Sequence, residues 1–525
     1  MGLGVPASTL LPTRREGTHQ SMQDPLIGYF QSHRKLVEDD ALDLIRGAPQ
    51  PLDLSRQLIE LAGTDSPFVT RAMVESLIGP SPHRTALAPP RAPAGTEPES
   101  LRMVPPLPRP EFSVMREGFE PLSADRDPLQ AYGGLFAHRF ATLSRILRGR
   151  SGLPDLTPIG SFRNREGEVS VIGMIREIRT TSEKHHTILT VEDDTGTLEA
   201  LVPKGSPEVR EPFLLDEVVG LRLRAGRERN RIPIVTGVLR PDVPASRDQH
   251  RTSFESRALF ISDLHIGSRS FLAEAWGRLV DYLDGAGPNP EIAETVRHVV
   301  IAGDLVDGIG IYPNQEHDLA ILDIFEQYAE LGRRLGELPS RIQIVAIPGN
   351  HDAVSPAEPQ PPLPHELAAT LPGPVKILAN PSTFSLDGVV VTAYHGRGFD
   401  DLIPALPGAT YARPTDVMKR MLAMRHLAPM YGGKTPLSPQ SRDGLILDPV
   451  PDIFVTGHAH TFGADRYKGI LLLNASTWQA ETGYQRMRNI SPVPARAALV
   501  RLTDLSLQVL DFSDAKPRLA DGAAT

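Results

Sequence analysis

The sequence contains no cysteine among its 525 residues. Disulfide bonds, iron–sulfur clusters and cysteine-ligated zinc are therefore excluded within this chain, and a reducing intracellular setting fits. No apolar run approaches the roughly 18 residues that a membrane helix needs. The first residues, MGLGVPASTLLPTRREG, lack the sustained apolar core of a secretory signal. We expect a cytoplasmic protein with no membrane partner.

The chain also lacks an excess of positive charge, because its net charge is −9. A uniformly basic nucleic-acid coat is thereby excluded, whereas local basic patches are not. Hydrophobic residues make up 40% and charged residues 23%, the balance of a globular protein. The length allows about two to four domains. The 50 prolines are nearly twice the usual share, so extended linkers are expected.

The first third of the chain reads as helical segments around a linker. Residues 22–79 space apolar residues three and four apart, which predicts a helical domain after a disordered stretch, 1–21. Residues 80–112 are rich in proline and predict a semi-rigid linker. A helical connector is expected over 113–166.

The remainder predicts a small barrel and an α/β domain. Residues 167–245 contain short strands separated by polar turns, the pattern of a β-barrel. Over 257–515, continuous apolar runs alternate with helical stretches, which favours strands buried on both faces. Residues 516–525 are expected to be a disordered tail.

Five apolar runs of the α/β region each end in residue types that bind metals. ALFIS is followed by DLH, HVVIAG by DLVDG, IQIVAIPG by NHD, VVVTAY by HGR, and DIFVTG by HAH. One such motif is ordinary turn material, but five idle turns together are improbable. Ligands bind at the carboxyl ends of the strands in open α/β sheets. The pattern predicts one site containing Asp263, His265, Asp304, Asn350, His351, Asp352, His395, His458 and His460.

The donors of this site are carboxylate, amide and imidazole groups without sulfur. This set suits two hard-to-borderline divalent ions. Mn²⁺ is the favoured cofactor, with Mg²⁺, Fe²⁺ and Zn²⁺ as alternatives.

The same residues resemble the calcineurin-like metallophosphoesterases, whose motifs run D-x-H, G-D, G-N-H-D/E, H and G-H-x-H in this order. The resemblance implies a metallophosphoesterase sandwich over 257–515. It also implies that Asp304 bridges two metal ions, that His351 donates a proton to the leaving oxygen and that Asp352 orients His351. The implied ligand sets are Asp263, His265 and His460 for one ion, and Asn350, His395 and His458 for the other.

Four further stretches resemble the small subunit of archaeal family D DNA polymerase. They are GDLVDGIGIYPNQE (303–316), RHLAPMYGGKTPLSPQ (425–440), PDIFVTGHAH (451–460) and LLLNASTWQAETGYQ (471–485). The order of parts also matches, so the barrel is expected to be an OB-fold. The resemblance implies a nucleoid-associated 3′→5′ exonuclease that proofreads single-stranded or mismatched 3′ ends of DNA for a separate large polymerase subunit. The alternatives are a catalytically silent scaffold of the same polymerase, and an unrelated phosphatase or cyclic-nucleotide esterase.

Basic and aromatic residues between the fourth and fifth motifs are candidates for DNA contacts. A solvated helix face is the alternative for about half of the basic ones, and a core position is the alternative for the tyrosine. The candidates are Arg397, Arg425, Tyr431 and Lys434.

Three other features carry weaker hypotheses. Asp307 either orients a histidine ligand or fixes its own loop, and the loop role is favoured. The stretch QDPLIGYF, from Gln23 to Phe30, fits the peptides that bind sliding clamps, although the inner face of a helix is the favoured alternative. The other histidines, including His298, are expected at the surface.

Overall fold

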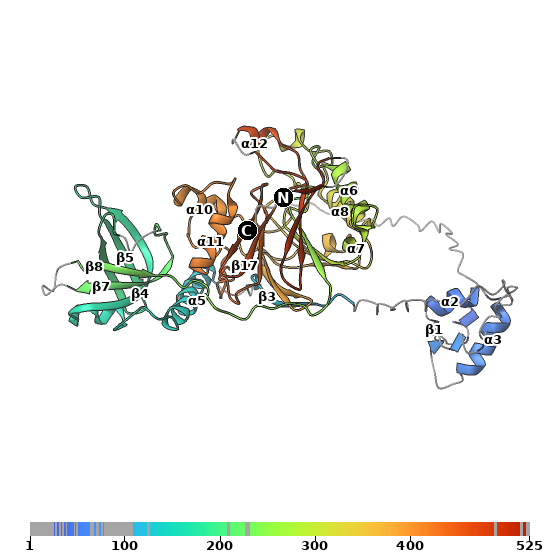
Figure 1. The fold of residues 1–525 in the computed structure, drawn as a ribbon, viewed down its shortest axis with the longest axis horizontal. Helices are drawn as coiled ribbons and strands as arrows, with labels where there is room; N and C mark the ends of the chain where they lie inside the picture. Colours follow the sequence, from blue (N-terminus) through green and yellow to red (C-terminus); the bar gives the residue numbers. More distant parts are fainter. Residues whose placement is uncertain are drawn as a thin grey trace, which may run out of the picture. The chain divides into compact units, whose positions relative to one another are not determined.

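The computed structural model describes parts of residues 26–77 and most of 109–520, with gaps at 123–126, 207–210, 226–231, 488–490 and 515–517. The chain forms two compact units, Met1–Val104 and Pro105–Thr525 (Figure 1). None of the described helices combines the length and apolar character needed to cross a membrane.

The first unit contains two short helices and a pair of parallel strands around a small core. Its elements are β1 (Leu36–Val37), α2 (Asp39–Arg46), α3 (Pro51–Ala62) and β2 (Phe68–Val69).

The proposed clamp-binding stretch contributes to that core. Leu26 is 9% exposed and Phe30 is 1% exposed, and both belong to the apolar cluster of the unit. Gln23 lies outside the described residues. Because a clamp peptide needs its apolar side chains free to enter a pocket, the burial of Phe30 supports the inner-face alternative.

The second unit begins with a strand where a helical connector was expected. β3 (Phe112–Glu117) pairs antiparallel with β13 (Ser382–Leu386) and forms the edge of a six-stranded sheet. The prediction was wrong at this point because the pairing partner lies far away along the chain. α5 (Pro128–Arg148) follows, and its buried Arg139 lies 2.6 Å from the Asp443 carboxylate, which ties the helix to the rest of the unit.

Five strands then close into a barrel with the order β4-β5-β6-β8-β7. All neighbours are antiparallel except β6 and β8, and alternate apolar residues such as Val171 and Leu189 fill the interior. The buried Arg420 contacts Glu217 from the barrel at 2.9 Å, so the barrel is fastened to the domain that follows. The strands are β4 (Gly167–Thr180), β5 (Thr187–Asp193), β6 (Gly196–Val202), β7 (Val218–Ala225) and β8 (Ile234–Leu239), preceded by η1 (Ile159–Asn164).

The largest part of the unit is a sandwich of two sheets, which confirms the predicted α/β fold. The seven-stranded sheet has the order β12-β11-β10-β9-β18-β19-β20, and the six-stranded sheet has the order β16-β17-β15-β14-β13-β3. The tail that was expected to be disordered contains β20. This strand is ordered because it pairs with β19 at the edge of the sheet.

The first sheet contains β9 (Arg257–Ile261), β10 (Val296–Ala302), β11 (Gln343–Ile347), β12 (Val375–Ile377), β18 (Arg496–Arg501), β19 (Leu507–Asp511) and β20 (Arg518–Ala520). The second contains β3 and β13 with β14 (Val389–Ala393), β15 (Ile453–Thr456), β16 (Phe462–Tyr467) and β17 (Ile470–Ala475). The helices of this region are α6 (Ala273–Leu283), α7 (Pro290–Ala293), η2 (Gln315–His317), α8 (Ile324–Gly336), α9 (His365–Ala368), α10 (Phe399–Ala405), α11 (Pro414–Met424) and α12 (Gly483–Met487).

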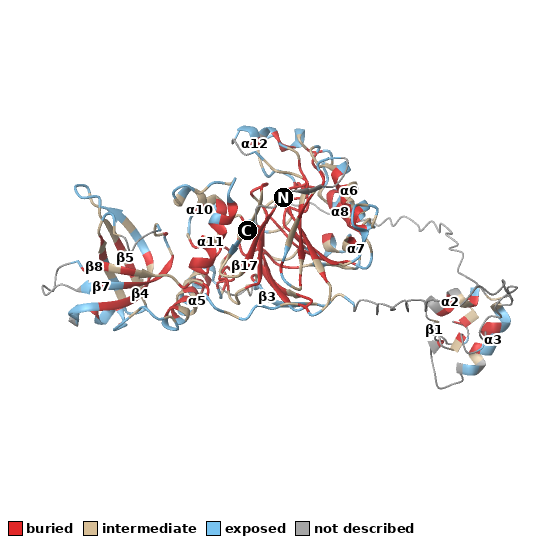
Figure 2. Cartoon of the chain, in the orientation of Figure 1, coloured by how far each residue is buried: buried red, intermediate tan, exposed pale blue. Residues whose placement is uncertain are grey.

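Side chains alternate between two cores along each central strand. In β9, Phe260 faces the other sheet, whereas Leu259 and Ile261 face α6 and α8. α10 and α11 cover the outer face of the six-stranded sheet in the same way. The central strands are therefore buried on both faces (Figure 2), which is why their sequences read as continuous apolar runs.

Candidate metal centre

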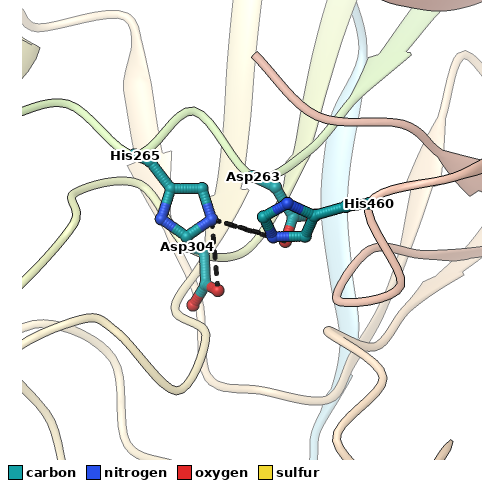
Figure 3. Close-up of side chains that lie close together, drawn as sticks. All are labelled: Asp263, His265, Asp304 and His460. Atoms are coloured by element: carbon teal, nitrogen blue, oxygen red, sulfur yellow. Dashed lines mark hydrogen bonds and ion pairs between the residues drawn. The ribbon is translucent and has the colours of Figure 1, made fainter. Parts of the chain in front are cut away.

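The polar motifs follow strands of both sheets and meet at one edge of the sandwich. Asp263, His265, Asp304 and His460 are buried, and each offers a ligand atom within 4.8 Å of the others (Figure 3). Nε2 of His265 lies 3.7 Å from Oδ2 of Asp304, and Nε2 of His460 lies 3.2 Å from Oδ1 of Asp263. These four residues form one half of the predicted site.

The other half adjoins it through the same aspartate. Nε2 of His395 lies 3.3 Å from Oδ2 of Asp304 and 3.0 Å from Oδ1 of Asn350. One carboxylate oxygen of Asp304 thus faces His265 on one side and His395 on the other. A bridging position requires this arrangement.

The backbone at these residues is strained. Asp263, His265, Asp304, His458 and His460 all have φ between 48° and 65°. The left-handed region costs a residue with a Cβ atom about 1–2 kcal/mol. Strain of this kind persists where a site requires it, so the clustering of five such residues supports a functional role.

Two glycines allow the loops to approach closely. A Cβ atom at Gly349 would lie 2.2 Å from Oδ1 of Asp304, and one at Gly303, where φ is +96°, would lie 2.4 Å from Nδ1 of His395. The glycines of the GD and GNHD motifs therefore make room for the candidate ligands.

Three histidines have their rings oriented by acceptors at Nδ1. His265 contacts Oδ1 of Asp307 at 2.9 Å, His395 contacts the carbonyl of Ala302 at 2.9 Å, and His351 contacts the carbonyl of Asp307 at 2.8 Å. A carbonyl can only accept, so Nδ1 of His395 and of His351 must carry the proton. Nε2 of each ring is then left facing the site.

Asp307 makes the contact to a histidine that the sequence analysis did not favour, together with contacts that hold its own loop. Its carboxylate orients His265 and also accepts from Nε2 of Gln479 at 3.0 Å and of Gln315 at 3.3 Å. Gln315 also donates to the Asp307 carbonyl at 2.8 Å, so Asp307 holds both a candidate ligand and its own loop.

The electrostatics of the site follow from its buried carboxylates. Burial alone would raise the pKa of Asp304, but the imidazoles of His395 and His351 outweigh it and hold that pKa well below its usual range. Burial lowers the pKa of His265, but the hydrogen bond to Asp307 and the charge of Asp304 raise it to about 9. For His395, Asp304 likewise outweighs burial and raises the pKa to about 10. The site therefore attracts positive charge.

His351 and Asp352 are both placed at the site, but they do not form the predicted pair. Asp352 accepts from the backbone N–H of Gly349 at 2.8 Å and from the hydroxyl of Tyr328 at 2.9 Å, while His351 is oriented through the Asp307 carbonyl. The prediction that Asp352 orients His351 was wrong, because the Asp352 side chain folds back beneath its own turn. Burial, with a further contribution from Asp304, raises the pKa of Asp352 to about 6.

His458 is not among the four residues whose ligand atoms lie within 4.8 Å of one another. Its backbone N–H donates to Asp263, and its ring lies 5.2 Å from that of His395 between centroids. Its Nε2 lies 3.2 Å from Oδ1 of Asp400. Asp400 was not anticipated, although it belongs to the same YHGRGFDD stretch as His395.

The TWQ-containing stretch proves to be a wall of the site. The backbone N–H of Trp478 donates to the carbonyl of Asp263 at 2.9 Å, Gln479 contacts Asp307, and Nε2 of Gln485 lies 2.7 Å from Nδ1 of His460. The sequence analysis singled out this stretch only through a resemblance, because an amide side chain alone carries no signal for such a role.

The candidate DNA contacts divide into two groups. Arg425 is buried, and its guanidinium donates to the carbonyl of Leu447 at 2.5 Å and lies 3.2 Å from Asp448, so the prediction was wrong for it. Tyr431 and Lys434 are exposed, and Arg397 is half-buried with one donor on the carbonyl of Pro356.

Comparisons with known proteins agree with this geometry. Residues 258–464 match the family of DNA polymerase alpha/epsilon B-subunits. The DNA polymerase II small subunit of Methanothermobacter thermautotrophicus is 35% identical over 501 residues, which cover 93% of this chain and 99% of that protein. The one from Archaeoglobus fulgidus is 40% identical over 369 residues, 70% of this chain and 74% of that protein.

Among solved structures, Vacuolar Protein Sorting 29 from Cryptosporidium parvum aligns with 51% of this chain and 97% of its own, with 17% identity and a TM-score of 0.27. The two relatives from archaea align over most of both chains, and they share one name. This chain belongs to the family of small subunits of archaeal DNA polymerase II, the family D polymerase that its motifs predict.

Proposed function

We propose that this protein is a metal-dependent 3′→5′ exonuclease that removes unpaired nucleotides from DNA for its polymerase. The observation that carries the proposal is the convergence of Asp263, His265, Asp304, Asn350, His395 and His460, most of them on strained backbone, around one shared carboxylate oxygen. Family membership supplies the polymerase, and with it a large catalytic subunit as partner.

The donor set fits two divalent cations. Carboxylate, amide and imidazole donors without sulfur suit Mn²⁺, and Mg²⁺, Fe²⁺ or Zn²⁺ as alternatives. One ion would be held by Asp263, His265 and His460. The other would be held by Asn350, His395 and His458, and Asp304 would contribute to both sets. Two such ions would supply positive charge for the scissile phosphate and lower the pKa of water.

His351 would act on the leaving group. Its Nδ1 is occupied by the Asp307 carbonyl, and its Nε2 lies 4.0 Å from Oδ2 of Asp304, facing the site. In the hydrolysis, the oxygen of water bonds to phosphorus while the bond from phosphorus to the 3′-oxygen breaks. The 3′-oxygen keeps the electron pair and takes a proton from Nε2 of the imidazolium form of His351. The proton that the attacking water loses passes to solvent, and a proton from solvent later restores the imidazolium. The products are a nucleoside 5′-monophosphate and a DNA strand one nucleotide shorter.

DNA would reach the site along the loops that carry the remaining candidates. Arg397 is two residues from His395 in the sequence. Lys434 and Tyr431 are both exposed and lie close together in the sequence. The ring of Tyr431 packs edge-on against Tyr132 and Phe136. These groups offer phosphate and base contacts, and the barrel, which we propose to be an OB-fold, would hold single-stranded DNA or the large subunit.

The test uses a 5′-labelled primer with a mismatched 3′ end, the purified full chain and Mn²⁺. Stepwise shortening is expected, with complete loss in excess chelator and a loss of about 10²–10⁴-fold in His351→Ala. His365→Ala, which changes an exposed histidine on α9, is the matched control and should cleave normally. Silence of the chain both alone and with its large subunit would favour the scaffold.

A further inference from the structure

Four large hydrophobic side chains are exposed beside the candidate metal centre. Ile309 is 49% exposed and Phe325 is 58% exposed, and Ile311 and Leu322 are exposed as well. We call these four residues the apolar rim. They lie on two segments, one directly after Asp307 and one leading into α8.

One buried side chain holds the two segments together. Nε2 of Gln327 donates to the carbonyl of Gly308 at 3.1 Å and to that of Ile321 at 2.9 Å, and its Oε1 accepts from the N–H of Gly308 at 2.9 Å. Gln327 is fully buried. The apolar rim is therefore fixed by hydrogen bonds at the base of both segments, although its side chains face solvent.

The same segments touch the residues around the proposed proton donor. A Cβ atom at Gly308 would lie 2.2 Å from the carbonyl oxygen of His351. Tyr328, which is one helical turn beyond Phe325, donates to Asp352 at 2.9 Å. Ile309, the first residue of the rim, therefore directly follows Gly308, whose backbone lies against His351.

Four exposed apolar side chains on two fixed segments beside a reaction site are unfavourable in water, and they indicate a contact with a ligand. At a phosphodiesterase site, the apolar part of the ligand is the base attached to the scissile nucleotide. Every base has an apolar face, so such contacts tolerate any sequence. In a duplex, stacking and pairing hold the terminal base away from such a surface.

We propose that the apolar rim packs against the bases of unpaired 3′-terminal nucleotides and thereby selects frayed or mismatched ends. This proposal rests on the proposed function of the site. It makes Ile309 and Phe325 specificity residues, since they touch the base and leave the phosphate to the metal centre.

The test compares two 5′-labelled single-stranded oligonucleotides, one with normal bases and one whose last two 3′ nucleotides are abasic. The variant Ile309→Ser/Phe325→Ser should lose about tenfold in kcat/KM on the first and keep the wild-type value on the second. Ile309→Leu/Phe325→Tyr should restore the preference. Leu129→Ser, at a side chain that is 77% exposed on α5, is the control and should change neither value.

Equal losses on both oligonucleotides, or no loss on either, would overturn the proposal. Fluorescence anisotropy measures binding of the same oligonucleotides in chelator, where no hydrolysis occurs. This measurement separates the proposed base contact from the proposed exonuclease activity. If the wild-type chain cleaves nothing, either alone or with its large subunit, the exonuclease proposal fails. About tenfold weaker binding of the base-containing strand by the variant would still support the base contact. Unchanged DNA binding with weaker association of the large subunit would assign the rim to the interface with that subunit and overturn the proposal.

Discussion

Two buried clusters of aspartate and histidine in the sandwich differ in the cation that balances the carboxylate. Asp387, in the turn between β13 and β14, accepts from Nε of Arg297 at 3.0 Å, from Nε2 of His298 at 2.8 Å and from Oγ of Ser256 at 2.6 Å. At the candidate metal centre, Asp263 and Asp304 face imidazoles instead.

This difference separates a structural cluster from a binding site. A guanidinium is permanently charged, so Arg297 balances Asp387 within the protein itself. An imidazole carries charge only when it is protonated, and protonation removes it as a metal ligand. Carboxylates that face imidazoles are therefore suited to a cation from outside the chain.

Asp304→Asn tests the binding side of this comparison and should give the largest effect. The substitution removes the carboxylate that faces both halves of the centre, so we expect DNA hydrolysis to fall at least about 10³-fold. The melting temperature of the metal-free protein should fall less than in Asp387→Asn, because the imidazoles that face Asp304 can lose their protons, whereas a guanidinium cannot. Exonuclease assays and calorimetry in chelator would measure the two effects, and retained activity with a melting temperature lowered as far as in Asp387→Asn would contradict the assignment.

Asp387→Asn should have the opposite profile. It leaves the buried Arg297 without its carboxylate, which should lower the free energy of unfolding by about 3–5 kcal/mol. Hydrolysis per folded molecule should be unchanged. Urea denaturation with a parallel exonuclease assay measures both quantities. An equal loss of activity and stability would remove the distinction between the two clusters.

The pH dependence of stability sharpens the same contrast. Burial raises the pKa of Asp387, but the hydrogen bond and charge of His298 outweigh it and hold that pKa below its usual range. A carboxyl group with a depressed pKa stabilises the fold above its unfolded value, about 3.9, and this stability is lost as pH falls below that value. The difference in free energy of unfolding between the wild-type protein and Asp387→Asn, taken from denaturation curves, should therefore be constant above about pH 4 and shrink progressively as pH falls below that value towards the depressed pKa of the folded state.

The sequence predicted the sandwich and the clustering of these polar side chains because both depend on local patterns. Apolar runs mark strands buried on two faces, and the polar residues that follow them must lie at one sheet edge. His298 was wrongly expected at the surface, because its partner Asp387 is far away along the chain. Arg425 was misassigned because its acceptors, the carbonyl of Leu447 and the carboxylate of Asp448, come near it only in the folded chain.

The contacts around the ligands were the least predictable. Gln315, Gln479 and Gln485 are polar residues without periodicity, and nothing in their spacing indicates that they face Asp307 or His460. The left-handed backbone of five motif residues is likewise invisible in a sequence, because their side chains disfavour it.

Asp307→Asn gives the smallest expected effect and decides between the two roles considered for this residue. Loss of the carboxylate weakens the orientation of His265, so Mn²⁺ affinity should fall about 10–100-fold, as titration calorimetry would measure. Asp318→Asn is the matched control, because Asp318 lies in the same loop and bonds to Tyr312 rather than to a ligand. If both variants bind Mn²⁺ equally and lose similar stability, Asp307 serves its loop, as the sequence favoured. A loss confined to Asp307→Asn would show that its carboxylate supports the metal centre.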